Sequence, residues 1–490
     1  MDMGAAAIAA NRFGYGAKPG ELRVIAGDPR GWVKAQLTPE RALPPQLAAL
    51  PPAEDDLLAF GRWLVARRLK GAKADKELAR AANLGYTEED LKKLSIEQSF
   101  VLNFRERYET AVKARLDAAA TTDRPVFERL AHFWGNHFTV SGVKPQAVAL
   151  PPSFEHEAIR PHVVGSFEKM LVSSTRHPGM LIYLDNWQSI GPHSFEAKRP
   201  KVINNPNVPR PTGLNENLAR EIMELHTLGV RGGYTQKDVT SFAAVLTGWT
   251  YDRSNLFAYL NQSKGTRTGD QLFRFAPGSH EPGPQTVMGK IYPQRDDVQG
   301  LAVLHDLAFH PSTAHFIATK LARHYIADAP PPAAVDRIAS VFTKSGGDLK
   351  ATMTAVVDSP EAWATPFAKF KRPEEYMISF MRMLNIPALP AQGALVALAT
   401  MGQPTYRASG PDGWADTSAS WLSADLVWKR LEWAQAACSR IARADVNPAQ
   451  IASLAFGEAL SEETLQAITR AESPAQELTM LAGSPEFQRR

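Results

Sequence analysis

The chain has 490 residues, of which 44% are hydrophobic and 22% charged, enough for about two to four domain-sized cores or one large helical assembly. Its 55 basic and 51 acidic side chains are interspersed and leave a net charge of +4, which gives no electrostatic case for binding nucleic acid or an anionic membrane. A single cysteine, Cys438, excludes an intramolecular disulfide and a thiolate zinc site.

The N-terminal sequence carries no pattern that targets the chain to a membrane. It lacks the basic segment and the long apolar segment of a signal peptide, and no later stretch approaches the roughly 18 apolar residues of a transmembrane helix. We therefore expect the protein to be cytoplasmic as encoded, and periplasmic only if a partner carries it across the membrane.

Most of the chain has the 3.6-residue periodicity of helices. We therefore predict a mainly α protein, with residues 1–490 forming one large multi-helix domain. The charged stretch 70–95 is typical of an exposed helical insertion. Residues 253–297 are rich in Gly and Pro and show short alternating runs, which predicts a minor β-hairpin element near 270–290.

The predicted helix within 122–142 carries several polar and aromatic side chains that could form a site. His137 follows the apolar face, whereas His132 and Asn136 form an i, i+4 pair beside Trp134. Two histidines, an amide and an indole could bind or act on a ligand. The alternative is that both histidines are hydrogen-bonded core residues.

The predicted helical hairpin over 212–252 carries the densest group of charged and polar side chains. Asn217, Glu221 and Glu224 share one flank of its first helix, and Arg220 lies nearby. A carboxylate beside the core, such as that of Glu221, must be paired or hydrogen-bonded. The alternative is an exposed ladder in which Glu216, Arg220 and Glu224 pair along the surface.

Two loop histidines and one aromatic loop complete the candidate set. His177 precedes Pro178, which favours presentation from a turn, although it could equally cap a helix end. His280 lies in the predicted hairpin element and could cover a site. Residues 400–423 form an irregular loop with Trp414, which could plug the core or stack on a flat ligand.

These side chains suggest one polar pocket between the 132–138 helix and the central hairpin. The groups that could perform acid–base catalysis are Glu221, Glu224, His132, His137, His177 and His280. The groups that could bind a substrate are Asn136, Trp134, Asn217, Arg220 and Trp414. A divalent metal held by some of the same groups is an open alternative, although the spacing fits no local metal motif.

Motifs along almost the whole chain resemble the large bacterial family called domain of unknown function 1800. They include Phe133-Trp134 with Asn136-His137-Phe138, Arg176-His177-Pro178, Asn215-Glu216-Asn217 through His226-Thr227-Leu228-Gly229, Gly402-Gln403-Pro404 and Ser484-Pro485-Glu486-Phe487. The resemblance implies a mostly helical protein with no assigned catalytic residues. It also implies a gene neighbour, an exported protein similar to sulfatases and phosphatases.

Three functional hypotheses follow. The first is a hydrolase-like enzyme that uses a Glu/His pocket, by acid–base or metal-assisted chemistry. The second is a non-catalytic binding or assembly partner of the sulfatase- or phosphatase-like neighbour, because the chain has no recognised catalytic signature. The third is a redox protein with a carboxylate-bridged metal pair in a helical bundle.

Overall fold

The computed structural model describes residues 2–40, 42–69, 100–199, 213–252, 266–364, 367–441 and 447–490. The predicted insertion at 70–95 lies outside these described residues. Within them, the chain is mainly α-helical, as predicted from its periodicity. None of the helices in these ranges combines the length and hydrophobicity that crossing a membrane requires.

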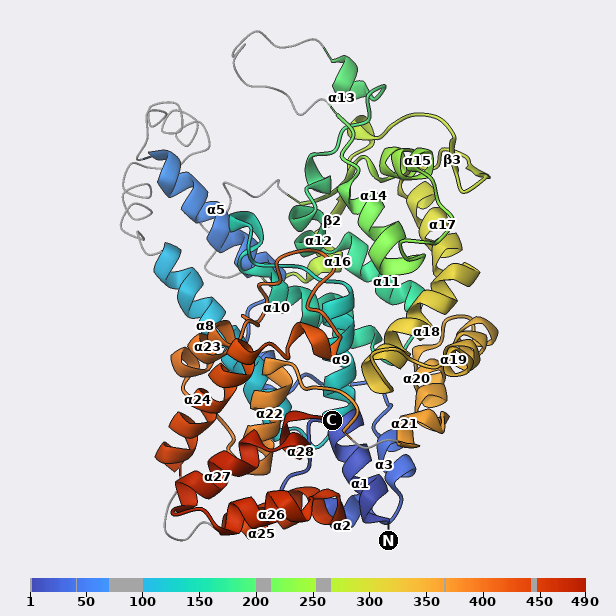
Figure 1. Cartoon of the computed structure of the whole chain (residues 1–490). Helices are drawn as coiled ribbons and strands as arrows, with labels where there is room; N and C mark the ends of the chain where they lie inside the picture. Colours follow the sequence, from blue (N-terminus) through green and yellow to red (C-terminus); the bar gives the residue numbers. More distant parts are fainter. Residues whose placement is uncertain are drawn as a thin grey trace.

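The helices follow one another closely along the chain (Figure 1). Up to residue 137 they are α1 (Met3–Ile8), η1 (Ala9–Phe13), α2 (Glu21–Ile25), α3 (Pro29–Ala35), α4 (Pro45–Ala48), α5 (Ala53–Leu69), α8 (Phe100–Thr121) and α9 (Pro125–His137). From there to the first strand they are η2 (Pro145–Ala147), α10 (Leu150–Phe154), η3 (Glu155–Ile159), η4 (Arg160–His162), α11 (Phe167–Arg176), α12 (Pro178–Tyr183), η5 (Asn186–Gln188), α13 (Phe195–Lys198), α14 (Asn217–Glu221), η6 (Ile222–Thr227) and α15 (Gln236–Leu246). The remaining helices are α16 (Gly269–Leu272), η8 (Pro277–Ser279), α17 (Asp296–Ala308), α18 (Pro311–Tyr325), α19 (Pro332–Lys344), α20 (Leu349–Asp358), α21 (Glu361–Ala364), α22 (Pro373–Met383), α23 (Ala391–Thr400), η9 (Ser418–Ser420), α24 (Ala424–Ile441), α25 (Pro448–Phe456), η10 (Gly457–Ala459), α26 (Glu462–Thr469), α27 (Pro474–Gly483) and α28 (Pro485–Gln488).

Among the described residues there are two small antiparallel sheets, and all their strands except β1 lie in or next to the predicted β-hairpin region near 270–290. Strand β1 (Trp249–Tyr251) pairs with β2 (Phe273–Phe275), so that Trp249 lies opposite Phe275. Strands β3 (Gln285–Val287) and β4 (Lys290–Tyr292) form a hairpin. Its two-residue turn has positive φ at Met288 and at Gly289, the combination of a type I′ turn, which matches the twist of a hairpin.

Side-chain caps explain where several helices begin. Thr235 and Asp238 form the capping box expected at the second helix of the central hairpin. His177 and His310 each precede a proline, and each Nδ1 accepts a hydrogen bond from the backbone N–H two residues later, at 3.0 and 3.1 Å. The two histidines therefore start α12 and α18, because they satisfy a backbone donor that the helix leaves free.

Helices α9 and α22 are central, because neither has a solvent-facing side. Eleven residues of α9, including its charged Glu128 and Arg129, are buried. Every residue of α22 from Pro373 to Met383 is buried. In Figure 1, α9 lies between the C-terminal helices α24–α27 and the group α11, α17 and α18. Helix α22 belongs to the apolar core that α8 and the C-terminal helices share, and α9 to the larger core.

Buried ion pairs join these central helices. Arg129 Nη1 of α9 donates to Glu375 Oε1 of α22 at 2.6 Å, and Arg490 Nε donates to Glu375 Oε2 at 3.2 Å. Burial opposes ionisation of Glu375, but the neighbouring arginines hold its pKa well below the usual range. Both carboxylate oxygens therefore remain ionised hydrogen-bond acceptors inside the protein.

We expect Glu375→Gln to lower the free energy of unfolding by about 3–5 kcal/mol, because it removes the anion of the buried Arg129 and leaves Arg490 with Asp416 alone. Urea denaturation of the whole chain measures this loss. The matched control is Glu109→Gln, which removes the partner of Arg105 in a surface pair at 2.7 Å. That change should alter stability by less than about 1 kcal/mol. Equal effects of the two variants would contradict the importance of the Glu375 pairs.

Candidate functional site

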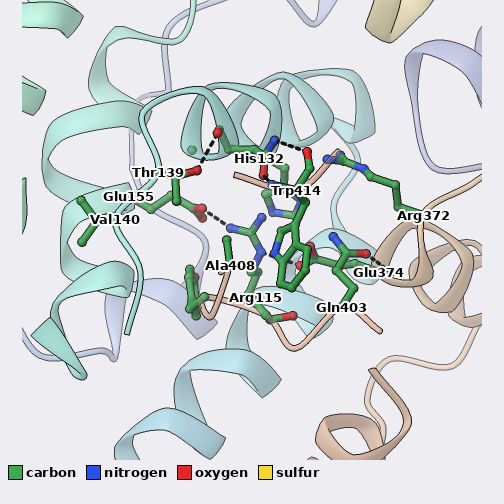
Figure 2. Close-up of a pocket in the computed structure, with 14 residues that line it drawn as sticks. Arg115, His132, Thr139, Val140, Glu155, Arg372, Glu374, Gln403, Ala408 and Trp414 are labelled. Atoms are coloured by element: carbon green, nitrogen blue, oxygen red, sulfur yellow. Dashed lines mark hydrogen bonds and ion pairs between the residues drawn. The ribbon is translucent and has the colours of Figure 1, made fainter. Parts of the chain in front are cut away.

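A small polar cavity of about 50 Å³ lies where α8, α9, η3 and the start of α22 meet the loop after α23 (Figure 2). Its lining residues are Arg115, His132, Gly135, Asn136, Thr139, Val140, Glu155, Arg372, Glu374, Gln403, Thr405, Tyr406, Ala408 and Trp414. Because one water needs roughly 10–15 Å³ of such space, the cavity can hold about three to five waters or the end of a larger molecule.

Arg115 of α8 organises the cavity by contacting two carboxylates. Its Nε donates to Glu374 Oε1 at 2.6 Å, and its Nη1 forms an ion pair with Glu155 Oε2. All three side chains are at least nine-tenths buried. Burial favours a neutral Arg115, but the two carboxylates outweigh it and hold the pKa of Arg115 above its usual range. The guanidinium therefore stays charged and fixes the positions of both carboxylates.

Glu155 reaches this position because α9 has a glycine opposite it. A Cβ placed on Gly135 would lie 2.7 Å from Glu155 Oε2, closer than a real side chain allows. Glu155 starts η3, a π-helical turn, and such turns often occur at functional sites. Its second oxygen, Oε1, is buried and has no hydrogen-bond partner. One carboxylate oxygen is thus anchored and the other is an unpaired hydrogen-bond acceptor.

His132, predicted as a catalytic residue, lines this cavity. Its Nδ1 lies 2.6 Å from the hydroxyl of Tyr15, and its Nε2 lies 3.3 Å from Glu128 Oε1. Glu128 also accepts two hydrogen bonds from Arg160, at 2.8 and 2.9 Å. Burial disfavours the Glu128 anion, but Arg160 and His132 hold its pKa well below the usual range. The imidazole therefore lies between the Tyr15 hydroxyl and an ionised carboxylate.

Asn136, predicted as a substrate-binding residue, holds the aromatic loop against α9. Its Nδ2 donates to the carbonyl of Trp414 at 2.9 Å, and its Oδ1 accepts from the N–H of Trp414 at 2.8 Å. Gly413, with φ of +75°, lies so close that a Cβ there would meet the carbonyl of Asn136 at 2.5 Å. The amide of Asn136 is therefore used by the loop backbone, and Trp414 is placed at the cavity.

His137 and His226 mark the place where α9 meets the first helix of the central hairpin. His137 Nε2 lies 3.0 Å from the carbonyl of His226, and the two ring centroids are 6.2 Å apart. Burial lowers the pKa of His137 well below its usual value and that of His226 to about 3. Both imidazoles are therefore neutral, and neither lines the cavity. Trp134, also predicted, packs beside His137 in the core.

Glu221 and Glu224 lie outside this cavity, in a separate partly buried acidic cluster. Burial, followed by the charge of Glu224, raises the pKa of Glu221 to about 7, and Asp412 adds to the effect. Glu224 Oε2 accepts a hydrogen bond from the hydroxyl of Tyr234 at 3.3 Å. The two predicted carboxylates therefore do not share the cavity that contains His132.

The remaining predicted residues have other partners. Arg220 pairs with Glu216 at 2.9 Å, which supports the alternative of a surface ladder for this pair. The N–H of Asn217 donates to Asn215 Oδ1 at the helix start. His177 Nε2 lies 3.0 Å from Glu157 Oε2, and His280 Nδ1 lies 2.9 Å from the carbonyl of Thr247. None of these four lines the cavity.

In the described part of the chain, no three His, Cys, Asp or Glu side chains are grouped closely enough to hold one metal ion. The central residues that the sequence analysis missed are Arg115, Glu155, Arg372 and Glu374. Each is an ordinary charged residue in a helical sequence, and only the Glu155-His156-Glu157 run was a visible signal. Tyr406 lies in the aromatic loop and has a positive φ of 60°, a conformation uncommon for tyrosine.

We expect Asn136→Ala to loosen the loop at 400–423, because the N–H and carbonyl of Trp414 then lose their partners, at a cost of about 1–3 kcal/mol. Limited proteolysis should cut this loop faster than in the wild type. Asn136→Asp is the matched control, because it keeps the acceptor for Trp414 N–H and should have an intermediate effect. Identical cleavage rates for all three proteins would contradict this role.

A second variant tests the acidic cluster. Between its ordinary pKa of 4.5 and its folded value of about 7, Glu221 binds a proton more tightly in the folded protein, so its contribution to stability falls as pH rises through this range. Glu221→Gln should therefore raise the free energy of unfolding by about 1 kcal/mol at pH 8, after allowance for partial exposure, and change it little at pH 4. Urea denaturation at both values measures this, with exposed Glu472→Gln as the control. A pH-independent effect would contradict the assignment.

Comparison with known proteins places nearly the whole chain in one family. A family model described as "Protein of unknown function (DUF1800)" matches residues 8–489. No curated protein and no solved structure matches the chain. Because the match covers nearly every residue, the resemblance noted in the sequence is confirmed, and the chain belongs to the DUF1800 family.

Proposed function

We propose that the protein is a hydrolase-like enzyme and that its reacting groups lie in the cavity around Arg115. The observation that carries this proposal is the state of Glu155: one oxygen is ion-paired with buried Arg115, and the other is buried without a partner. A carboxylate held in this way is suited to take a proton from a water molecule. His132 supplies the imidazole of the proposed Glu/His pocket.

In the proposed reaction, Glu155 Oε1 removes a proton from water while the water oxygen attacks the electrophilic centre of a small ester. The attack places negative charge on the ester oxygen. Arg115 and the Tyr406 hydroxyl are the nearby donors for this charge, with the Tyr406 ring 5.1 Å from the guanidinium. Burial raises the pKa of Tyr406, so its hydroxyl remains protonated and able to donate. Glu155 then gives its proton to the leaving oxygen as the bond to it breaks.

His132 lines the same cavity and transfers no proton in this scheme. Its ring is bound to the Tyr15 hydroxyl on one side and lies 3.3 Å from Glu128 on the other. Several groups on the cavity wall support a polar occupant, because Thr405 Oγ1, Tyr406 Oη and Glu155 Oε1 are all buried without hydrogen-bond partners. Since the cavity is only about 50 Å³, the reacting end of the substrate must be small.

The test is hydrolysis of three small probes, 4-nitrophenyl acetate, phosphate and sulfate, by the full-length chain. We expect the wild type to release 4-nitrophenolate from at least one probe, and Glu155→Gln to lower kcat by about a hundredfold or more. The amide keeps the size of the side chain and its contact with Arg115, but it cannot accept the proton. The loss of kcat is measured between pH 5 and 9 by stopping the reaction and reading the absorbance of the released 4-nitrophenolate.

The control is Glu168→Gln on α11, whose carboxylate pairs with the half-exposed His305 and does not line the cavity. It should leave turnover unchanged. Thermal unfolding of each variant separates loss of chemistry from loss of fold. A Glu155→Gln protein with wild-type turnover would contradict the proposal, and so would a loss of activity that follows the loss of folded protein.

A second candidate function is that of a non-catalytic binding or assembly partner of the sulfatase- or phosphatase-like gene neighbour. It is favoured by an apolar groove of about 600 Å³ between α24, α26 and α27, where Trp428 is 62% exposed and Met480 37%. Exposed apolar surface of this kind often marks a protein contact. The same assay separates the candidates, because a binding partner predicts no turnover by either wild type or Glu155→Gln. If this second function holds, the protein would reach the periplasm bound to that partner.

A further inference from the structure

The other side of η3 borders a second and larger cavity, of about 610 Å³. Its lining includes Leu43, Leu47 and Leu50 from the proline-rich segment around α4, and His156 and Glu157 of η3. Glu155 lines the small cavity, whereas the next two residues line this one. A mainly apolar cavity of this size, with a few polar groups, is typical of small-molecule sites.

The charged groups on its walls already have partners. Arg160 donates to Glu40 at 2.7 and 3.0 Å, and to Glu128 as described above. Glu157 accepts from the N–H of Ala53 at 2.8 Å and from that of Gly269 at 2.6 Å, in addition to His177. The lining contains two carboxylates, Glu40 and Glu157, and one arginine, Arg160, which Glu40 shares with Glu128, so the charge of the lining is negative. An anionic ligand is therefore disfavoured.

His156 differs from these groups. His156 is only 8% exposed, and its Nε2 is buried without a hydrogen-bond partner. Burial lowers the pKa of His156 to about 4, so the imidazole is neutral at pH 7. When its proton is on Nδ1, the neutral imidazole of His156 has Nε2 as a hydrogen-bond acceptor. A buried acceptor without a donor costs free energy, which a bound donor would recover.

We propose that this cavity binds a small amphiphile whose alkyl chain lies against Leu43, Leu47 and Leu50 and whose head donates a hydrogen bond to His156. The chemical class is an aliphatic alcohol or alkylammonium, not a carboxylate. This site is distinct from the cavity around Arg115 and does not rest on the proposed hydrolytic function.

The test uses three probes with the same alkyl chain: 1-octanol, octylammonium and octanoate. Isothermal titration calorimetry of the full-length chain at pH 7.5 should show saturable binding of one octanol and of one octylammonium. Octanoate should bind at least about tenfold more weakly, because it lacks a donor and meets a negative wall. Equal affinities for all three probes, or no saturable binding, would overturn the proposal.

A variant locates the binding. His156→Phe keeps a ring of similar size and removes Nε2, so the affinity for octanol should fall about three- to tenfold, the worth of one hydrogen bond. The matched control is His315→Phe, at an exposed position of α18, which should bind octanol as the wild type does. Unchanged octanol affinity in a folded His156→Phe protein would overturn the assignment of the head group.

If circular dichroism shows that His156→Phe does not fold, Leu43→Gln replaces it. Leu43 is only partly buried, so the fold should tolerate this change, while the alkyl chain loses its apolar contact. Octanol should then bind at least about threefold more weakly. Wild-type affinity in Leu43→Gln would show that the probe binds elsewhere, which would overturn the proposal.

Discussion

The pairing of buried charges on α22 is the constraint on which the rest of this structure depends. Because α22 has no exposed side, Glu374 and Glu375 cannot be solvated and must find cations inside the protein. Glu375 takes Arg129 from α9, and Glu374 takes Arg115 from α8. These contacts fix α22 against α8 and α9, which lie far from it in the sequence, and Arg115, held in this way, also positions Glu155. The small cavity is a consequence of how the charges are matched.

The aromatic loop closes this arrangement because it is tied down at two places. Asn136 binds the backbone of Trp414, and Asp416 accepts a hydrogen bond from His324 at 2.7 Å. Asp416 is also surrounded by cations, and although burial opposes ionisation, His324 and Lys369 hold its pKa well below the usual range. A loop fixed at both points can present Tyr406 and Trp414 to the cavity without forming a helix or strand of its own.

In the described part of the chain, three π-helical turns carry or lead to residues of the candidate sites. They are η1, which leads to Tyr15, η3, which carries Glu155, and η6, which carries Glu224 and His226. The wider turn of a π-helix shifts the side chains that follow it relative to an α-helix. In η3, Glu155 lines the small cavity, whereas the next two residues, His156 and Glu157, line the larger one. A helical wheel with 3.6 residues per turn does not predict that neighbouring residues of η3 line different cavities.

The sequence by itself determined the mainly α fold, the hairpin near 270–290 and the Thr235 capping box, because periodicity and capping act within a few residues. It also pointed to His132, Asn136 and Trp414, since polar and aromatic side chains cluster visibly there. Only the tertiary structure decided which carboxylates join them. Glu221 and Glu224 looked suitable on their own helix, but Glu155 and Glu374 occupy the cavity because buried Arg115 pairs with both. That pairing joins residues 40 and 259 positions from Arg115, and no local pattern encodes such a contact.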